Sequence, residues 1–253
     1  MSIFGNLARF YDTVYADKDY AAEATYVIKL LDMHSHDCKH LLELGSGTGR
    51  HAIELARASR HVVGIDASHD MVTLANERLS RHHLEGVSFL TADATRYRGA
   101  LLFDAVIACF HVLNYMATPR ALIDAFSTAA AHLPKGGLFL FDSWHGPAVR
   151  ASGPDTRVRD LRAESMDIVR IAQPKHDPEH QTVDVRYRFF TRQPPTTEWH
   201  LIEETHHLRY LFRNDVIDAC EKTGFELILD EEWLSGKPLN EATWNACYLA
   251  RRT

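Results

Sequence analysis

The stretch Leu41-Leu42-Glu43-Leu44-Gly45-Ser46-Gly47-Thr48-Gly49-Arg50 decides the fold, because it joins a short apolar strand to a glycine-rich turn and the start of a helix. Glycines in such a turn permit positive φ angles and let a ligand approach the backbone closely. The N-terminus of the following helix offers free N–H groups. The stretch therefore predicts a nucleotide-type cofactor site at the end of a buried strand.

The spacing of these glycines distinguishes two classes of cofactor. The dinucleotide fingerprint is GxGxxG, and here Arg50 stands where its third glycine is required. This departure disfavours a nicotinamide-dependent oxidoreductase, which stays open as an alternative from another enzyme class.

Outward from this turn, short apolar runs alternate with longer helical stretches over residues 20–142. This alternation is typical of βαβ units and of a mostly parallel sheet. We predict helices at residues 21–31, 50–58, 70–81 and 120–132. We predict strands at residues 40–44, 61–65, 87–90, 103–109 and 138–142.

After residue 166 the period of the apolar residues changes to two, which is the pattern of antiparallel strands. We predict such strands at residues 166–173, 182–192 and 198–212, with a turn at residues 174–180. A helix follows at residues 214–223, with Asn214 as its N-cap and Gly224 beyond its end. Two final strands, at residues 225–233 and 245–250, return to the sheet.

The chain is therefore expected to have three parts. Residues 1–145 form a cofactor-binding core with an N-terminal lid, residues 146–212 an inserted antiparallel β cap over the substrate, and residues 213–253 the return of the core. Arginines alternate with acidic residues between residues 155 and 170, which predicts a mixed solvated surface. Exposed cap strands could pair with a second copy, so a homodimer is a hypothesis.

The composition disfavours several classes of protein. The chain has 253 residues, with 28 Lys and Arg against 34 Asp and Glu and a formal charge of -6, so no overall basic field attracts nucleic acid. No apolar run approaches the roughly 18 residues that span a bilayer, and the start lacks the pattern of a secretory signal. The four cysteines are widely spaced and read as reduced thiols. We expect a cytoplasmic globular protein with neither a membrane nor a nucleic-acid partner.

The 16 histidines raise the question of a metal site. The adjacent pairs at residues 82–83 and 206–207 point their side chains apart, and prolines disfavour a helix that would align His176 with His180. We expect no protein-bound metal.

Two carboxylates follow the next two predicted strands. Asp66 ends the strand after the glycine-rich turn, where its oxygens can accept hydrogen bonds from ribose hydroxyls. Asp93 ends the strand after that, where it can accept from an exocyclic adenine amine. Because open α/β sheets bind ligands at the carboxyl ends of their strands, these side chains and the glycine turn are expected at one edge.

These motifs resemble the class I S-adenosylmethionine-dependent methyltransferases over almost the whole chain. The segments that carry the resemblance are Glu43-Leu44-Gly45-Ser46-Gly47-Thr48-Gly49, Val63-Gly64-Ile65-Asp66-Ala67-Ser68, Ala92-Asp93-Ala94, Phe103-Asp104-Ala105-Val106 and Leu133-Pro134-Lys135-Gly136-Gly137. The resemblance implies an α/β, Rossmann-like fold: a seven-stranded, mostly parallel sheet with its last strand antiparallel and helices on both faces.

The same resemblance implies S-adenosylmethionine as the cofactor. The glycine loop would lie against its methionine and ribose, Asp66 would hold the ribose hydroxyls, and Asp93 would recognise the adenine. We expect the cofactor to contact Tyr11, Tyr20, Glu43, Gly45, Ser46, Gly47, Gly49, Asp66, Ala67, Met71, Asp93, Ala94 and Cys109.

Within this class, the chain resembles the nucleotide-linked amino-sugar N-methyltransferases, which also carry an inserted antiparallel cap. The segments concerned are Phe10-Tyr11-Asp12-Thr13-Val14-Tyr15, Lys18-Asp19-Tyr20-Ala21-Ala22-Glu23-Ala24 and Phe141-Asp142-Ser143-Trp144. This resemblance implies N-methylation of a small acceptor, an amino-sugar nucleotide. It also aligns Tyr115 with a histidine that some members place near the substrate.

Methyl transfer requires alignment of the reacting groups and exclusion of water more than a strong base. An attacking amine must be neutral, and a histidine or tyrosine nearby can take its proton. The catalytic candidates are Tyr15, His111 and Tyr115. The acceptor-binding candidates are Tyr15, His111, Asn114 and Trp144.

Other interpretations stay open. An O-methyltransferase of a sugar, glycan or other metabolite would use the same donor loop, and a non-enzymatic protein that senses S-adenosylmethionine would keep the loop without turnover. His111 could equally be a packed, hydrogen-bonded histidine, and Tyr11 and Tyr15 could form the packed face of a helix.

Overall fold

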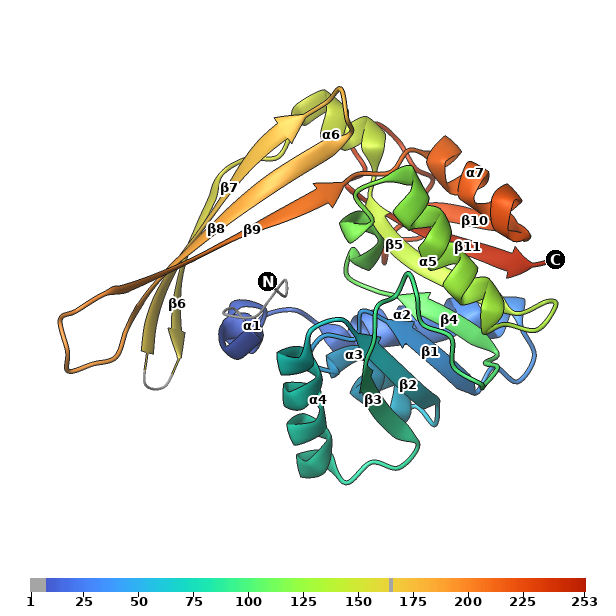
Figure 1. Ribbon diagram of the computed structural model, residues 1–253, viewed down its shortest axis with the longest axis horizontal. Helices are drawn as coiled ribbons and strands as arrows, with labels where there is room; N and C mark the ends of the chain where they lie inside the picture. Colours follow the sequence, from blue (N-terminus) through green and yellow to red (C-terminus); the bar gives the residue numbers. More distant parts are fainter. Residues whose placement is uncertain (1–7, 164–165) are drawn as a thin grey trace.

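The computed structural model describes residues 8–163 and 166–253, and it consists of a seven-stranded sheet and a separate four-stranded sheet (Figure 1). The helices are α1 Ala8–Val14, α2 Tyr20–His34, α3 Arg50–Arg57, α4 His69–His82, the 3₁₀ turn η1 Val112–Tyr115, α5 Pro119–Ala131, α6 Gly146–Ser152 and α7 Arg213–Thr223. The strands are β1 His40–Leu44, β2 His61–Asp66, β3 Val87–Thr91, β4 Ala105–Ala108, β5 Leu138–Trp144, β6 Arg157–Ala163, β7 Met166–Asp177, β8 Thr182–Arg192, β9 His200–Arg209, β10 Phe225–Glu232 and β11 Asn245–Arg252.

The large sheet has the strand order β10-β11-β5-β4-β1-β2-β3. Strands β1 to β5 pair in parallel, whereas β11 runs antiparallel to both β5 and β10. The predicted seven-stranded sheet with an antiparallel last strand is therefore confirmed. The strand order reverses between β1 and β4, and open α/β sheets bind ligands at the carboxyl edge of such a switch point.

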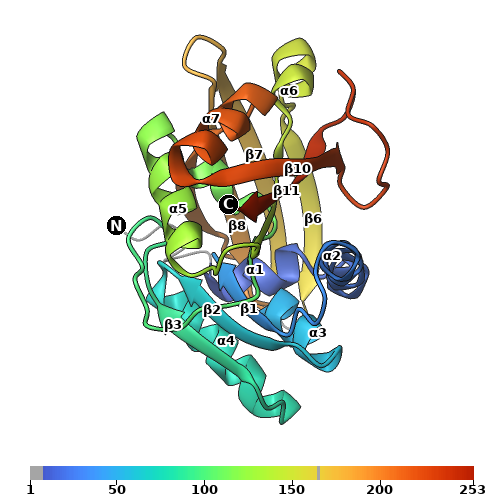
Figure 2. The same cartoon turned by 90° about the vertical axis from the view of Figure 1, so that its right-hand side faces the viewer.

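Two apolar clusters cover the large sheet, one on each face. Helices α2, α3 and α4 supply the first, and α5 and α7 supply the second (Figure 2). The central strands are buried on both faces, and for this reason β4 and β5 read as continuous apolar runs instead of alternating ones. The helices and this double burial hold the carboxyl edge of β1, β2 and β4 in place.

The small sheet is an antiparallel meander in the order β6-β7-β8-β9, and in Figure 1 it reaches out beside the core as a long twisted ribbon. The turn expected at residues 174–180 is wrong in its first half, because β7 continues through Pro174, which pairs with Val185 of β8. Strand β6 pairs no further along β7 than Ala172. Pro174 therefore lies at an edge, where its missing N–H costs no ladder hydrogen bond.

Strand β6 has no counterpart among the predicted strands, and the mixed solvated surface expected there forms an edge strand. Its charged side chains leave little apolar periodicity, and Val158 is 60% exposed. Backbone hydrogen bonds with β7 hold β6 at the edge of the sheet, where charged residues are common. Helix α6 was also not predicted.

The N-cap predicted at Asn214 is wrong, because α7 begins one residue earlier. The backbone N–H of Phe212 donates to Oδ2 of Asp215 at 2.9 Å. This carboxylate satisfies the helix start in place of Asn214 and also favours the positive end of the helix dipole.

Helix α1 packs on the inner face of the small sheet. Phe10 and Val14 join Ile168 and Phe189 in one apolar cluster, and the rings of Phe10 and Phe189 stack at 6.4 Å. Among the residues described, no helix is long and apolar enough to cross a membrane. Nor do His, Cys, Asp and Glu residues of the described segments gather into a group that could hold a metal ion.

Candidate cofactor and acceptor site

The glycine turn after β1 has three glycines in the left-handed region, with φ of 68° at Gly45, 54° at Gly47 and 76° at Gly49. A Cβ added to Gly45 would lie 2.5 Å from Cγ2 of Val112, so the segment after β4 presses directly on this turn. A Cβ added to Gly47 would meet no atom within 4 Å. The turn is therefore packed on one side and open at Gly47, which gives a ligand access to its backbone.

Asp66 lies at the end of β2, directly beside the turn. Its Oδ2 accepts a hydrogen bond from Gly47 N at 2.9 Å, and its Oδ1 accepts from Ser68 N at 2.8 Å. Burial raises the pKa of Asp66 above its ordinary value, and the two backbone bonds partly oppose this rise. Because each carboxylate oxygen has a second lone pair, the group can still accept from two vicinal hydroxyls.

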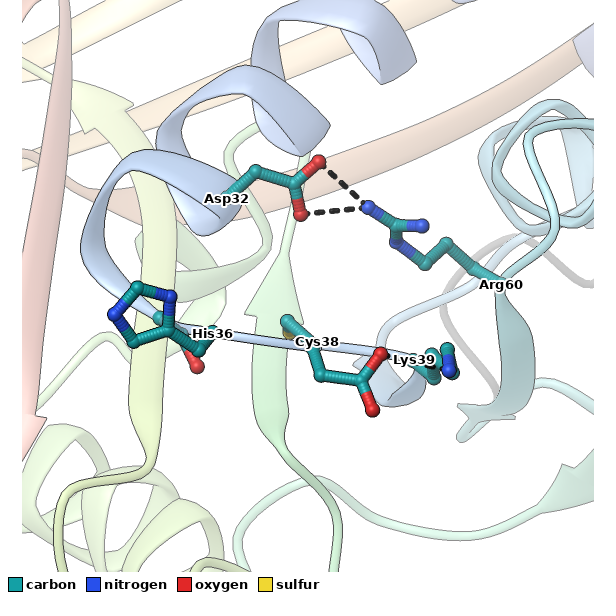
Figure 3. Close-up of a pocket in the computed structure, with 7 residues that line it drawn as sticks. Asp32, His36, Cys38, Lys39 and Arg60 are labelled. Atoms are coloured by element: carbon teal, nitrogen blue, oxygen red, sulfur yellow. Dashed lines mark hydrogen bonds and ion pairs between the residues drawn. The ribbon is translucent and has the colours of Figure 1, made fainter.

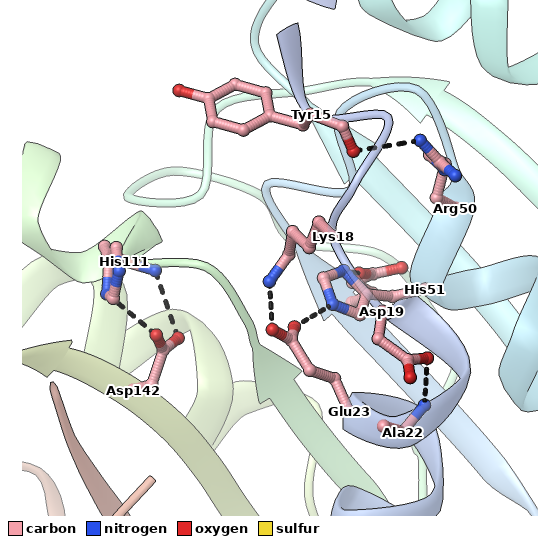
Figure 4. A network of polar contacts seen from close by, with 10 residues as sticks. Tyr15, Lys18, Asp19, Ala22, Glu23, Arg50, His51, His111 and Asp142 are labelled. Carbon is pink, nitrogen blue, oxygen red and sulfur yellow. Dashed lines mark hydrogen bonds and ion pairs between the residues drawn. The ribbon is translucent and has the colours of Figure 1, made fainter. Parts of the chain in front are cut away.

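Glu43, the residue before the last one of β1, is 1% exposed. Burial, with the nearby charge of Asp66, raises the pKa of Glu43 to about 8. Its Oε1 lies 3.8 Å from Nδ1 of His51, and the Nε2 of that ring lies 2.7 Å from Oε2 of Glu23. Figure 4 shows His51 and Lys18 pointing at the Glu23 carboxylate, which lowers the pKa of Glu23 to about 2 against its burial.

Several buried polar atoms around the turn have no hydrogen-bond partner within residues 8–163 and 166–253. They are Oη of Tyr20, Oε2 of Glu43 and Oγ of Ser46. Buried polar atoms are normally satisfied, so such a cluster calls for an explanation. All three residues belong to the predicted cofactor contacts, and a polar, cationic ligand at the turn would satisfy them.

The backbone after β4 is strained beside the turn. Phe110 and His111 are consecutive non-glycine residues in the left-handed region, with φ of 68° and 63°. Such conformations cost about 1–3 kcal/mol each and persist where the surroundings impose them. Here the His111 N–H donates to Oδ1 of Asp142 at 3.0 Å, and His111 Nδ1 lies 2.8 Å from Oδ2 of Asp142 (Figure 4).

The close approach of His111 Nδ1 to Asp142 is an ion-pair contact, since its angle does not make it a well-directed hydrogen bond. Asp142 is 1% exposed, so its interaction with the ring is little screened by water. The imidazole of His111 and the carboxylate of Asp142 are thus held together beside Val112, and Val112 in turn packs against Gly45.

The N-terminal segment closes over this edge. Thr48 Oγ1 donates to Oδ1 of Asp12 at 2.8 Å, and Arg78 also contacts that carboxylate. The Tyr15 ring lies edge-on to Phe110 at 5.0 Å and tilts against Tyr11 at 4.8 Å. Tyr11 and Tyr15 therefore pack against neighbouring rings and also lie beside the glycine turn, so packing and a place at the site do not exclude each other.

The inserted sheet supplies a further polar chain. Tyr115 Oη lies 2.8 Å from Nδ1 of His206 on β9, and His206 Nε2 lies 3.1 Å from Oε1 of Glu204. Tyr11, Val14, Tyr15, Arg170, Tyr187, Phe189 and His206 line a small hollow between α1 and the sheet. Sequence reasoning missed Arg170, Glu204 and His206, and alternation along β7 and β9 was the signal that could have placed them on one face.

The remaining predicted site residues lie at different depths. Asp93 is exposed, and its Oδ1 accepts from both N and Oγ1 of Thr95. Asn114 is fully buried: its Nδ2 donates to the carbonyl oxygen of Arg209, and its Oδ1 accepts from the backbone N–H of Trp144. The Trp144 ring lies 6.2 Å from that of His111, so Trp144 borders the site.

Three further predicted cofactor contacts, Met71, Ala94 and Cys109, are at least partly buried, whereas Ala67 is exposed. Burial raises the pKa of the Cys109 thiol well above its ordinary value, so it acts as an apolar group.

A separate hollow of about 310 Å³ opens at the other end of the large sheet, near the starts of β1 and β2 (Figure 3). Its Arg60 is already bound by Asp32 through contacts of 2.6 and 2.8 Å, and Lys39 pairs with Asp37 at 2.7 Å. Burial raises the pKa of Cys38 in this hollow to about 12, which leaves the thiol protonated and unreactive.

Comparison with known proteins places the chain in a family. A family model described as a methyltransferase domain matches residues 41–137. The chain is 31% identical over 148 residues to the dTDP-3-amino-3,4,6-trideoxy-alpha-D-glucopyranose N,N-dimethyltransferase of Streptomyces venezuelae, a match that covers 58% of this chain and 60% of that enzyme. It is 26% identical over 239 residues to the dTDP-3-amino-3,6-dideoxy-alpha-D-glucopyranose N,N-dimethyltransferase of Streptomyces fradiae, covering 92% and 88%.

A solved structure agrees with the fold. The structure of SAM-bound CalS10, an amino pentose methyltransferase from Micromonospora echinaspora, superposes with a TM-score of 0.76 at 24% identity, over 96% of each chain. Together with the glycine turn, Asp66 and the seven-stranded sheet, these matches identify the family. The chain belongs to the class I S-adenosylmethionine-dependent methyltransferases.

Proposed function

We propose that this protein transfers a methyl group from S-adenosylmethionine to the amine of a small acceptor, an amino-sugar nucleotide. The observation that carries the proposal is the His111–Asp142 pair, held by strained backbone beside the glycine turn. The named relatives that act on amino sugars support the choice of acceptor class.

The residues around the turn fit the proposed cofactor. The open side of Gly47 leaves room for the ligand, and Asp66 can accept from ribose hydroxyls. A cationic ammonium or sulfonium near Glu43 would favour its charged form and supply its orphaned oxygen with a partner. When bound, S-adenosylmethionine supplies an electrophilic methyl group activated by the positive sulfur.

The acceptor side must deliver a neutral nitrogen. An ammonium group brought to His111 can pass its proton to the ring, whose Nε2 has no hydrogen bond among the described residues. Asp142 then stabilises the imidazolium through the contact at Nδ1, and the amine keeps the lone pair that attacks. A His–Asp pair can also take the proton of a hydroxyl, so the choice of N-methylation over O-methylation is supported by the relatives that act on amino sugars and not by the pair itself.

The lid and cap exclude water. Tyr11 and Tyr15 lie between the core and the inserted sheet, and burial raises the pKa of both phenols, so they stay protonated and can donate hydrogen bonds. Exclusion of bulk water strengthens the electrostatic contacts inside and protects the reacting groups.

The test is to incubate the protein with S-adenosylmethionine and paired panels of amino-sugar and hydroxy-sugar nucleotides, with mass detection of added methyl groups. We expect methylation of at least one amine. Methylation of a hydroxyl while every amine stays unmodified would overturn the choice of acceptor group. Tight binding of S-adenosylhomocysteine with no acceptor modified would instead favour the sensing protein.

A further inference from the structure

We propose that the inner face of the inserted sheet binds the phosphate or diphosphate of the acceptor through Arg170. The proposal rests on the proposed acceptor class and names the group that recognises its anionic part. S-adenosylmethionine carries no phosphate, so such a subsite belongs to the acceptor and not to the donor.

The pairing of the strands places Arg170 on the inner face. It lies opposite Phe189 of β8, and Ile168 on the same face of β7 packs with that ring against α1. A charged side chain at this position interrupts an otherwise apolar row. Burying a charge is costly unless a partner compensates it, so the position requires an explanation.

Arg170 lacks that partner within the described part of the chain. Arg170 is only 8% exposed, and its Nε is buried without a hydrogen bond. No described carboxylate lies within 4.0 Å of its guanidinium. By contrast, Arg186 and Arg192 of the cap pair with carboxylates, namely Glu203 at 2.8 Å and Asp167 at 2.6 Å. Glu204, on the same face of β9, bonds His206.

Two aromatic rings lie beside the guanidinium. Its central carbon lies 4.9 Å from the centroid of the Tyr187 ring and 5.9 Å from that of Tyr15. Rings beside an arginine do not use up its N–H groups, and these groups match the oxygens of a phosphate in a bidentate arrangement. Arg170 and both tyrosines line the same hollow.

Tyr15 connects the subsite with the segment that carries His111. Tyr15 contacts Arg170 on one side and Phe110 on the other, and Phe110 precedes His111. One aromatic ring thus separates the arginine from the strained segment. An acceptor with its amine at His111 and its diphosphate at Arg170 would span the lid from core to cap.

The test measures binding of dTDP and of inorganic diphosphate by calorimetry, with the protein saturated with S-adenosylhomocysteine. We expect Arg170→Gln to weaken dTDP binding by roughly ten- to a hundredfold, because hydrogen bonds to charged groups are lost. The matched control is Arg188→Gln on β8, which removes a guanidinium that bonds Gln173 at 3.3 Å, and it should leave dTDP binding unchanged. No binding of dTDP or diphosphate to the wild type, or equal binding to Arg170→Gln, would overturn the subsite.

Thermal denaturation without ligand supplies the second readout. Removal of an uncompensated buried charge should leave the melting temperature of Arg170→Gln unchanged or raise it, whereas a structural arginine would lower it. A lowered melting temperature with intact dTDP binding would assign Arg170 a structural role. Binding of dTDP that depends on Arg170, without methylation of any amine, would leave the subsite standing and refute only the proposed function.

Discussion

The two halves of the site are built in different ways. At the sheet edge, backbone N–H groups and short carboxylates lie within a few residues of the strand ends, as with Gly47 and Asp66. In the inserted sheet, side chains from neighbouring strands converge across the lid, as with Arg170 and Tyr187. The half proposed to bind the donor is therefore encoded locally, whereas the half proposed to bind the acceptor depends on strand pairing over long sequence distances.

The largest effect on stability and cofactor binding should come from Gly45→Ala, which changes the locally encoded glycine turn. The new Cβ would clash with Val112 at 2.5 Å in a left-handed conformation, at a cost of about 2–4 kcal/mol in folding free energy. S-adenosylhomocysteine binding, measured by calorimetry, should fall at least about tenfold.

Gly136→Ala is the control for this substitution. Gly136 has φ of 85°, yet a Cβ there would meet no atom within 4 Å. Only backbone strain of about 1 kcal/mol is expected, with cofactor binding unchanged. Equal losses in the two variants would show that strain alone, and not the contact with Val112, governs the turn.

Glu43→Gln should change how stability depends on pH. The folded pKa of about 8 lies above the unfolded value, so the folded chain holds its proton more tightly. Its contribution to stability is complete below the unfolded pKa and is lost as pH rises through 8. Urea denaturation of the cofactor-free protein should show a fall on the order of 3 kcal/mol between pH 5 and pH 8 that Glu43→Gln largely removes. An identical fall in both proteins would contradict the assignment.

Asp142→Asn tests the pair at the junction of the two halves. The uncharged amide would no longer stabilise an imidazolium at His111, so kcat should drop by roughly ten- to a hundredfold while S-adenosylhomocysteine affinity holds. Asp177→Asn is a matched control, because Asp177 also pairs with a histidine, His180 at 2.9 Å, but on an exposed turn. Unchanged kcat in Asp142→Asn would remove His111 from the proton path.

The smallest effect is expected from His206→Gln, in the non-local half. Loss of the ring that meets Tyr115 Oη should raise KM for the acceptor by roughly three- to tenfold without altering donor binding. Its neighbour His207 pairs with Asp184 on the exposed face of the same strand, and His207→Gln should leave KM unchanged. Equal KM values for the two variants would break the link between cap and acceptor.

The same contrast explains what could be predicted. The glycine turn and Asp66 were found because each lies at the end of an apolar run, and the seven-stranded sheet with its antiparallel last strand followed from the family resemblance. The roles assigned to the individual site residues, including Asp93 for adenine, stay predictions. So do the boundaries of the three parts, the homodimer and the expected compartment.

What was missed shares one physical cause. Strand β6 owes its position to its backbone ladder with β7, and the Glu23–His51–Glu43 chain joins α2, α3 and β1. Arg170 is one of many arginines in the sequence; Arg209 is buried as well but pairs with Asp215, so burial together with the lack of a described acidic partner sets Arg170 apart. None of these features leaves a mark within a single window of sequence.

The inserted sheet leaves and re-enters the core at one point. Gly146 N donates to Leu211 O at 2.8 Å, and Leu211 N donates to Trp144 O at 3.1 Å. These hydrogen bonds join the two ends of the inserted segment. The outer part of the inserted sheet lies away from this junction, whereas Arg209 at its inner end contacts both Asn114 and Asp215 of the core. If the inserted sheet binds the acceptor as proposed, this junction is the point at which a different outer sheet could be exchanged while the core with its glycine turn is kept.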